Sequence, residues 1–146
     1  MIALIQRVTG GSVEVEGRTV AAMGRGILAL IGIEASDDID TAARLLDKVL
    51  TYRIFPDEAG KMNLDLRQIG GDLLLVPQFT LVADTRKGTR PSFSAAAKPE
   101  NARQLFLALV AKAQAAHPRV EAGIFGADMQ VRLVNDGPVT FNLHVT

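Results

Sequence analysis

Leu73-Leu74-Leu75-Val76-Pro77-Gln78-Phe79-Thr80-Leu81 is the stretch of this chain that indicates most about its architecture. Its first four residues form an unbroken apolar run, which is typical of a strand buried inside a sheet. The residues that follow bring an amide, an aromatic ring and a hydroxyl together at the end of that strand. Scaffolds commonly present functional side chains in this way, on a connection held by a rigid element. The stretch therefore predicts a buried strand over residues 73–76 and a candidate site directly after it.

Around this strand, the hydrophobic pattern predicts an α+β fold. One amphipathic helix is expected after the N-cap candidates Asp37 and Asp38, and a second is expected from about Pro99 to His117-Pro118. Strand-like runs cluster toward both ends of the chain, at residues 2–8, 12–15, 19–23, 26–33, 120–125, 129–134 and 139–145. We expect a largely antiparallel or mixed β-sheet with the two main helices on one face, in a single domain over residues 1–146.

Two of the predicted strands, residues 26–33 and 73–76, are apolar almost throughout. Such strands need cover on both faces. Two helices do not fully provide that cover, so the pattern predicts a homodimer.

The motif Asn135-Asp136-Gly137-Pro138-Val139-Thr140 separates two of the strand-like runs. Asp-Gly-Pro commonly marks a tight turn, and only about 5% of X-Pro bonds in folded proteins are cis. Spacing alone therefore favours a turn at Gly137-Pro138. The glycines at Gly10-Gly11, Gly24, Gly26 and Gly70-Gly71 are likewise interpreted as turns, because they form no phosphate-binding pattern.

Composition narrows the classes of function. The chain has 146 residues, 48% hydrophobic and 22% charged, and no cysteine, which excludes disulfides, thiolate nucleophiles and cysteine-ligated metals. Its two histidines, His117 and His144, have no HExxH or paired-carboxylate spacing around them, so we expect no metal and no cofactor. The start lacks a basic leader and no run approaches about 18 apolar residues, so we expect a cytoplasmic protein with no membrane contact.

Sixteen basic and sixteen acidic residues cancel, so any contact with RNA must be local. The best local cluster comprises Arg86, Lys87, Arg90, Lys98 and Arg103, in a stretch that Gly88 and Pro91 mark as a surface loop. A solvated loop and an RNA contact both fit this cluster.

Several side chains carry two interpretations each. Thr80 is either a nucleophile or a structural residue, and no histidine, lysine or N-terminal amine is adjacent to activate it. Without a triad, a hydrolytic site here would depend on positioning and on backbone N–H donors to a developing oxyanion. Gln78 either binds a substrate or caps the strand, and Phe79 either shapes a pocket or fills the core. Arg7 either pairs with a carboxylate or braces a loop carbonyl.

Taken together, several motifs resemble the D-aminoacyl-tRNA deacylase family, and the resemblance runs essentially from Met1 to the C-terminus. Several motifs in the same order indicate a family far more specifically than any one motif alone. They are Met1-Ile2-Ala3-Leu4-Ile5-Gln6-Arg7-Val8, Tyr52-Arg53-Ile54-Phe55, Gly60-Lys61-Met62-Asn63-Leu64, Gln78-Phe79-Thr80-Leu81, Arg90-Pro91-Ser92-Phe93 and Asn135-Asp136-Gly137-Pro138-Val139-Thr140.

The resemblance implies a homodimer with its active sites at the subunit interface. Such an enzyme hydrolyses the ester between a D-amino acid and the terminal ribose at the 3' end of aminoacyl-tRNA, a chiral proofreading step in translation quality control. Glycyl-tRNA, such as glycine mischarged on tRNA(Ala), is also an implied substrate because glycine has no side chain.

Residue by residue, Gly137-Pro138 matches the family's Gly-cis-Pro motif, which enters the neighbouring subunit's site and blocks L-amino acids. Arg7 matches the residue that holds this motif in place. Gln78, Phe79 and Thr80 match the catalytic pocket, where backbone N–H groups bind the ester carbonyl and the tRNA 2'-hydroxyl helps to activate water.

This chain departs from the family at Pro77, where the usual motif is Ser-Gln-Phe-Thr. A hydroxyl and a backbone N–H are lost there. A related branch of the family has Pro-Gln-Ala-Thr and a relaxed, differently oriented Gly-Pro motif, whereas Phe79 and Arg7 favour the D-specific branch.

Two alternatives stay open. One is a hydrolase of smaller D-aminoacyl esters or amides, which the net charge of zero allows. The other is a noncatalytic dimeric nucleic-acid-binding module, which would bind tRNA or DNA with salt-dependent affinity and no turnover.

Overall fold

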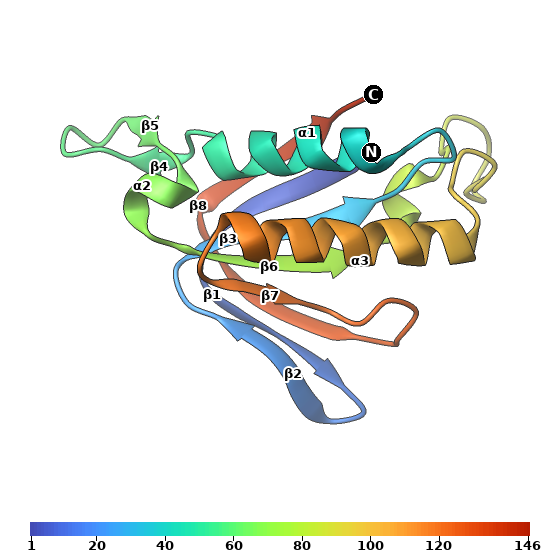
Figure 1. Ribbon diagram of the computed structural model, residues 1–146, viewed down its shortest axis with the longest axis horizontal. Coiled ribbons are helices and arrows are strands. Elements are labelled where there is room, and N and C mark those ends of the chain that lie inside the picture. The colour runs from blue at the N-terminus through green and yellow to red at the C-terminus, as the bar shows by residue number, and fades with distance from the viewer.

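The computed structural model describes Met1–Thr146 and has an α+β fold built on a six-stranded mixed sheet (Figure 1). Five strands follow one another across the sheet, and β8 pairs with β1 outside this path. β1 pairs antiparallel with β2, β3 and β8, whereas β6 is parallel to both β3 and β7. The order is β2 (Arg18–Met23), β1 (Ile2–Val15), β3 (Gly26–Gly32), β6 (Asp72–Pro77) and β7 (Val120–Ala122), with β8 at Gln130–His144.

Two helices, α1 (Ile39–Thr51) and α3 (Pro99–Ala116), cover one face of the sheet (Figure 1). The Asp38 carboxylate caps α1 by accepting the Thr41 N–H at 2.8 Å, and Pro99 lies in the first turn of α3. Their apolar sides contribute to a core of 22 buried residues that also includes Leu73 and Leu75 of β6. The predicted fold class, both helices and the buried strand at residues 73–76 are thus confirmed.

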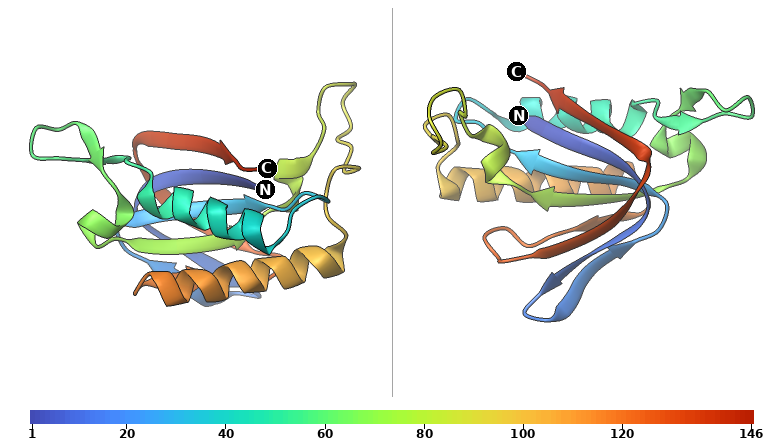
Figure 2. Two further views of the ribbon diagram at one scale, coloured as in Figure 1. Left: turned by 45° about the horizontal axis from the view of Figure 1, so that its top comes forward. Right: turned by 180° about the vertical axis from the view of Figure 1, so that it is seen from behind.

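The opposite face of the sheet is covered by the same chain. Figure 2 shows β1, β2 and β8 curving away from the helices, so that the sheet is strongly bent. Inside the bend lies a second, smaller core of seven residues: Val8, Val13, Ala21, Met23, Leu28, Leu74 and Val76. The bent sheet thus supplies the cover for β3 and β6 that we expected from a partner subunit, so this argument no longer supports a homodimer, and the homodimer itself stays a prediction.

Other sequence predictions were wrong at the level of single elements. Residues 2–8 and 12–15 form one strand, β1, and Gly10-Gly11 lies inside it rather than in a turn. Gly26 likewise begins β3. Four short elements were not predicted: β4 (Phe55–Pro56), β5 (Met62–Leu64), α2 (Leu66–Ile69) and a 3-10 helix, η1 (Phe79–Val82). No helix is both long enough and apolar enough to cross a membrane.

The first residue is held by ion pairs beside the main core. The Met1 ammonium donates to Glu34 and Asp37, both at 2.6 Å, and to the Val145 carbonyl at 2.8 Å. Glu34 also bonds His144 Nε2 at 2.7 Å. Burial raises the pKa of Glu34, but the hydrogen bonds from the ammonium and His144 outweigh burial and lower that pKa below its ordinary 4.5.

We predict that Glu34→Gln destabilises the protein by about 2 kcal/mol near neutral pH, because hydrogen bonds to a charged group are lost. A carboxyl whose folded pKa is lowered stabilises the fold above its unfolded pKa, and this contribution disappears as pH falls through the folded pKa. The difference between wild type and variant should therefore shrink below pH 4.5. Urea unfolding across this pH range measures it, with the exposed Glu58→Gln as control. An equal difference at all pH values would contradict the prediction.

Candidate functional site

The predicted amide, ring and hydroxyl do lie together, at the junction of β6 and η1. The Gln78 N–H donates to the Ile31 carbonyl at 2.7 Å, which is the last bond of β6 to β3. The Gln78 side-chain amide donates to the Thr80 hydroxyl. The Phe79 side chain is 60% exposed, so it is not a core residue. The junction therefore presents all three groups at the surface.

Two backbone donors are free at this junction. The N–H groups of Phe79 and Thr80 donate to no carbonyl of the chain, because they open the 3-10 helix η1. The only hydrogen bond of the Thr80 hydroxyl joins it to Gln78, and no base contacts it. Free N–H groups at a surface can stabilise negative charge on an oxygen, whereas a hydroxyl without a base is a poor nucleophile. The geometry favours electrophilic assistance by backbone over covalent attack by Thr80.

A cavity of about 300 Å³ adjoins this junction, and Phe79, which carries one of the two free N–H groups, lines it. One wall comes from the end of β6 with Gln78 and Phe79, and the other comes from the connection between β7 and β8. The lining residues are Val76, Pro77, Gln78, Phe79, Phe125, Gly126, Ala127, Asp128, Met129 and Val131. Sequence reasoning missed the second wall, because residues 125–129 carry no motif and are brought here only by the parallel pairing of β7 with β6.

Pro77, the departure from the family motif, lines this cavity. The backbone groups of odd-numbered residues in β6 form their hydrogen bonds on the side of β7. The Leu73 N–H donates to the Arg119 carbonyl, and the Leu75 carbonyl accepts the Gly123 N–H. β7 ends at Ala122, and the backbone nitrogen of Pro77 faces Gly123 just beyond that end, where a Cβ on Gly123 would meet Pro77 Cδ at 3.4 Å. The proline therefore removes no hydrogen bond of the sheet. It does leave the cavity with one backbone N–H donor fewer.

Gly137-Pro138 does not form the predicted turn. It lies inside β8, which pairs with β1 on both sides of it: Thr140 is opposite Gln6, and Asn135 is opposite Val8. Residues 136–139 therefore bulge from the strand opposite the single residue Arg7. The Gly137-Pro138 bond is cis, and Gly137 has a φ of 145°, which favours glycine.

Arg7 and Asn135 hold this bulge. Arg7 Nε donates to the Asp136 carbonyl at 2.9 Å, and its NH1 group donates to the Ile54 carbonyl at 2.8 Å. The side-chain oxygen Oδ1 of Asn135 accepts the Val139 N–H at 2.7 Å, and the side-chain Nδ2 donates to the Thr140 hydroxyl at 2.8 Å. Arg7 thus braces loop carbonyls, and its Nε also lies 3.5 Å from the Asp136 carboxylate, so both of its predicted roles are found. Sequence reasoning gave no separate role to Asn135, although its position before Asp-Gly-Pro is a signal for a side-chain cap.

The two motifs lie far apart within one chain. Pro77 pairs with Ile31, which is opposite Ala3, whereas the bulge is opposite Arg7, four residues further along β1. At about 3.3 Å per residue and about 4.8 Å per strand, they are roughly 13 Å apart along the strands and three strands apart across the sheet. Figure 2 shows η1 and the middle of β8 toward opposite ends of the strands. One chain does not combine them in a single site.

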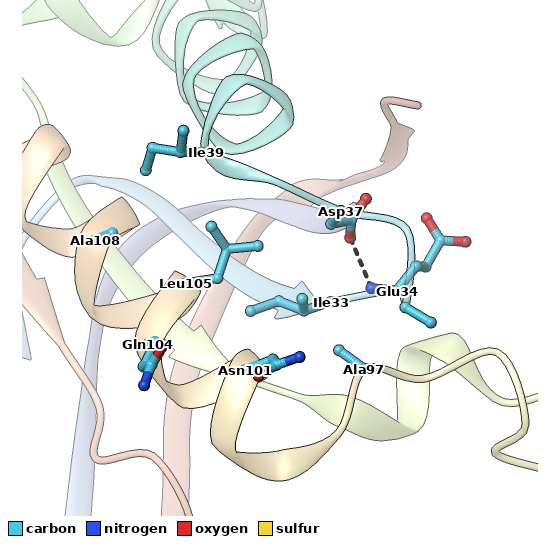
Figure 3. A pocket seen from close by; sticks show the side chains of 10 residues that line it. Ile33, Glu34, Asp37, Ile39, Ala97, Asn101, Gln104, Leu105 and Ala108 are labelled. Carbon is cyan, nitrogen blue, oxygen red and sulfur yellow. Dashed lines mark hydrogen bonds between the residues drawn. The ribbon is translucent and has the colours of Figure 1, made fainter.

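A second cavity, of about 340 Å³, lies between the beginnings of α1 and α3 (Figure 3). Ile39 and Leu105 supply apolar walls, while Asp37 accepts the Glu34 N–H at 2.7 Å. None of the predicted site residues lines it, and its carboxylates already serve the Met1 ammonium. We therefore place the candidate site at the β6–η1 junction.

The histidines have structural contacts. His117 is buried, and its Nε2 bonds the Gly71 carbonyl at 2.7 Å, while His144 bonds Glu34. No three His, Cys, Asp or Glu side chains gather in a way that could hold a metal ion.

Known proteins resemble the chain over nearly its whole length. The sequence model of the family D-Tyr-tRNA(Tyr) deacylase matches residues 4–144. A D-aminoacyl-tRNA deacylase of Teredinibacter turnerae is 59% identical over 143 residues, which is 98% of this chain and 99% of the relative. One of Alkalilimnicola ehrlichii is 60% identical over 141 residues, covering 97% of this chain and 94% of the relative.

Two solved structures share the fold. The c-Myc DNA Unwinding Element Binding Protein superposes with a TM-score of 0.94 at 37% identity, covering 99% of this chain and 98% of that chain. A probable eukaryotic D-amino acid tRNA deacylase superposes with a TM-score of 0.84 at 17% identity, covering 97% and 98%.

We predict that Asn135→Ala releases the bulge while the surrounding sheet stays folded. Loss of one hydrogen bond worth about 1 kcal/mol should speed exchange of the Val139 amide hydrogen by roughly five- to tenfold. Asn135→Asp keeps the acceptor oxygen for Val139 and should retain most of the protection. Amide hydrogen exchange followed by NMR makes the comparison. Equal exchange at Val139 in wild type and Asn135→Ala would refute the role of Asn135.

Proposed function

The chain belongs to the D-Tyr-tRNA(Tyr) deacylase family, and we infer that it is a hydrolase acting on the ester bond of D-aminoacyl-tRNA. The products are free tRNA and the amino acid. We propose that it also hydrolyses glycyl-tRNA mischarged on tRNA(Ala), because glycine presents no side chain to a selectivity filter. Such substrates are made where proteins are synthesised, which favours a cytoplasmic location.

The observation that carries this proposal is the pair of free N–H groups on Phe79 and Thr80 at the β6–η1 junction, where Phe79 also lines a cavity of about 300 Å³. A carbonyl oxygen bound there gains negative charge when water attacks the ester, and backbone donors already in position stabilise that charge. No base contacts the Thr80 hydroxyl, and Asp128 is the only carboxylate among the residues that line the cavity. The 2'-hydroxyl of the substrate's terminal ribose is the proposed group that helps to activate water.

We propose that selectivity comes from Gly137-Pro138 of a second subunit in a homodimer. Within one chain the motif lies too far from Gln78 to line the same cavity. Arg7 and Asn135 hold it from both sides, so it is suited to act as a rigid wall. A rigid wall against the α-carbon of the substrate rejects an L side chain by exclusion rather than by favouring the D form.

The direct test is single-turnover deacylation of matched D-tyrosyl-tRNA and L-tyrosyl-tRNA, with an enzyme-free control for spontaneous hydrolysis. We expect rapid loss of the D-ester alone. Loss of both esters would contradict the steric filter, and loss of neither would contradict the hydrolase. Sedimentation of the purified protein tests the homodimer separately.

A second candidate function is nucleic-acid binding without turnover. It is favoured by the 37% identity to a protein whose name describes binding to a DNA unwinding element. The net charge of zero argues against strong nonspecific binding to DNA. Binding of tRNA or duplex DNA with no loss of ester would favour this alternative over the hydrolase.

We predict that Gly137→Ala lowers selectivity for the D-ester by tenfold or more. An added Cβ would meet Val139 Cγ2 at 2.7 Å and Val139 N at 2.9 Å, so the bulge must shift. The matched control is Gly17→Ala, which also has a positive φ but meets nothing within 4 Å and lies in the distant β1–β2 turn. Single-turnover rates with both esters give the selectivity, which should stay at the wild-type value in the control. If Gly137→Ala kept the wild-type ratio of the D-ester and L-ester rates, the bulge would not be the cause of the selectivity.

A further inference from the structure

We propose that the loop of residues 84–92, here called the basic loop, binds backbone phosphates of the tRNA acceptor end. This inference rests on the proposed function, because it concerns how the same substrate is held outside the ester-binding pocket. Four observations carry it: the loop is closed by its own bonds, its free cations have no partner, no carboxylate offsets them, and it begins beside the pocket.

The loop has a defined base. Asp84 and Ser92 pair through both backbone bonds, at 2.8 and 3.0 Å. Arg86 is held against Asp84 by two side-chain bonds, Nε to Oδ1 at 2.9 Å and the second nitrogen to Oδ2 at 2.7 Å. These hydrogen bonds hold the pKa of Asp84 far below its ordinary value, so the pair stays charged. Arg86 therefore shapes the loop, and its charge is offset within it.

Lys87 and Arg90 are different from Arg86. Both side chains are exposed, and neither forms an ion pair or a hydrogen bond. The stretch between Asp84 and Glu100 contains no acidic residue, in a chain whose sixteen basic and sixteen acidic residues cancel overall. Two unpaired cations without a nearby carboxylate form a local positive surface, which suits phosphate groups.

The position of the basic loop favours RNA over other anionic partners. The loop leaves η1 directly after the candidate catalytic residues, and Phe93 behind it packs on Phe79 with ring centroids 5.2 Å apart. Phe79 also lines the 300 Å³ cavity. Figure 2 shows the loop, in yellow, projecting from the body of the molecule. A tRNA whose 3' ester lies in the cavity must lead its backbone away from it, and the loop is the cationic segment at that exit.

The test is the double variant Lys87→Gln/Arg90→Gln, which removes both free cations and leaves the Asp84–Arg86 pair intact. Its matched control is Arg18→Gln/Lys112→Gln, which removes one arginine and one lysine from exposed positions away from the site. The measurement is kcat/KM for D-tyrosyl-tRNA over a range of salt concentrations. D-tyrosyl-adenosine, which has the ester and the ribose but no backbone phosphates, is measured in parallel.

We expect the double variant to lose roughly tenfold in kcat/KM on the tRNA ester, mainly through KM, and to have a salt slope shallower by about 1 to 2. On D-tyrosyl-adenosine the defect should vanish. The control should match the wild type on both substrates. A wild-type salt slope in the double variant, or an equal defect on both esters, would overturn the proposal. If wild type cleaves neither ester, the proposed function itself has failed, and tRNA binding by the same variants still tests the loop.

Discussion

The pairing of β1 with β8 is the interaction on which the rest of the structure depends. It joins the two ends of the chain, and it continues on both sides of residues 136–139. Because the flanking pairs are in register, the extra residues have no place in the ladder and must leave it. Arg7 occupies the position opposite them and bonds the Asp136 and Ile54 carbonyls. A strand interrupted in this way gives a short loop with the rigidity of a sheet.

That rigidity explains how so small a set of polar groups could be selective. A flexible loop would yield to an L side chain, and the energetic difference between the two enantiomers would be small. A bulge held by Arg7 from one side and by Asn135 from within cannot yield without breaking partly buried hydrogen bonds to the backbone. In the proposed function, chemistry and selectivity are therefore separate tasks: the β6–η1 junction supplies the oxyanion donors, and the bulge supplies only shape.

Local sequence signals predicted the parts of the fold that depend on neighbours along the chain. The buried run at residues 73–76, the cap at Asp38 and the proline at the start of α3 are of this kind. The bulge was interpreted as a turn, because Asp-Gly-Pro has the same local chemistry in both and only pairing with β1, about 130 residues away, separates them. The second core and the second cavity wall were missed for the same reason, since both depend on how the sheet bends.

A chain with no net charge must bind a polyanion without relying on a general attraction. If the affinity came from a diffuse positive surface, every RNA in the cell would compete with the substrate, since phosphates are alike. In the proposed function, the two unpaired cations of the basic loop, which begins beside the pocket, tie phosphate contact to the presence of a 3' end there. Because these proposed contacts are few, they also limit the affinity for tRNA, so that the deacylated tRNA dissociates quickly. A chain with no net charge is therefore compatible with the proposed binding of tRNA, because the proposed phosphate contacts are local.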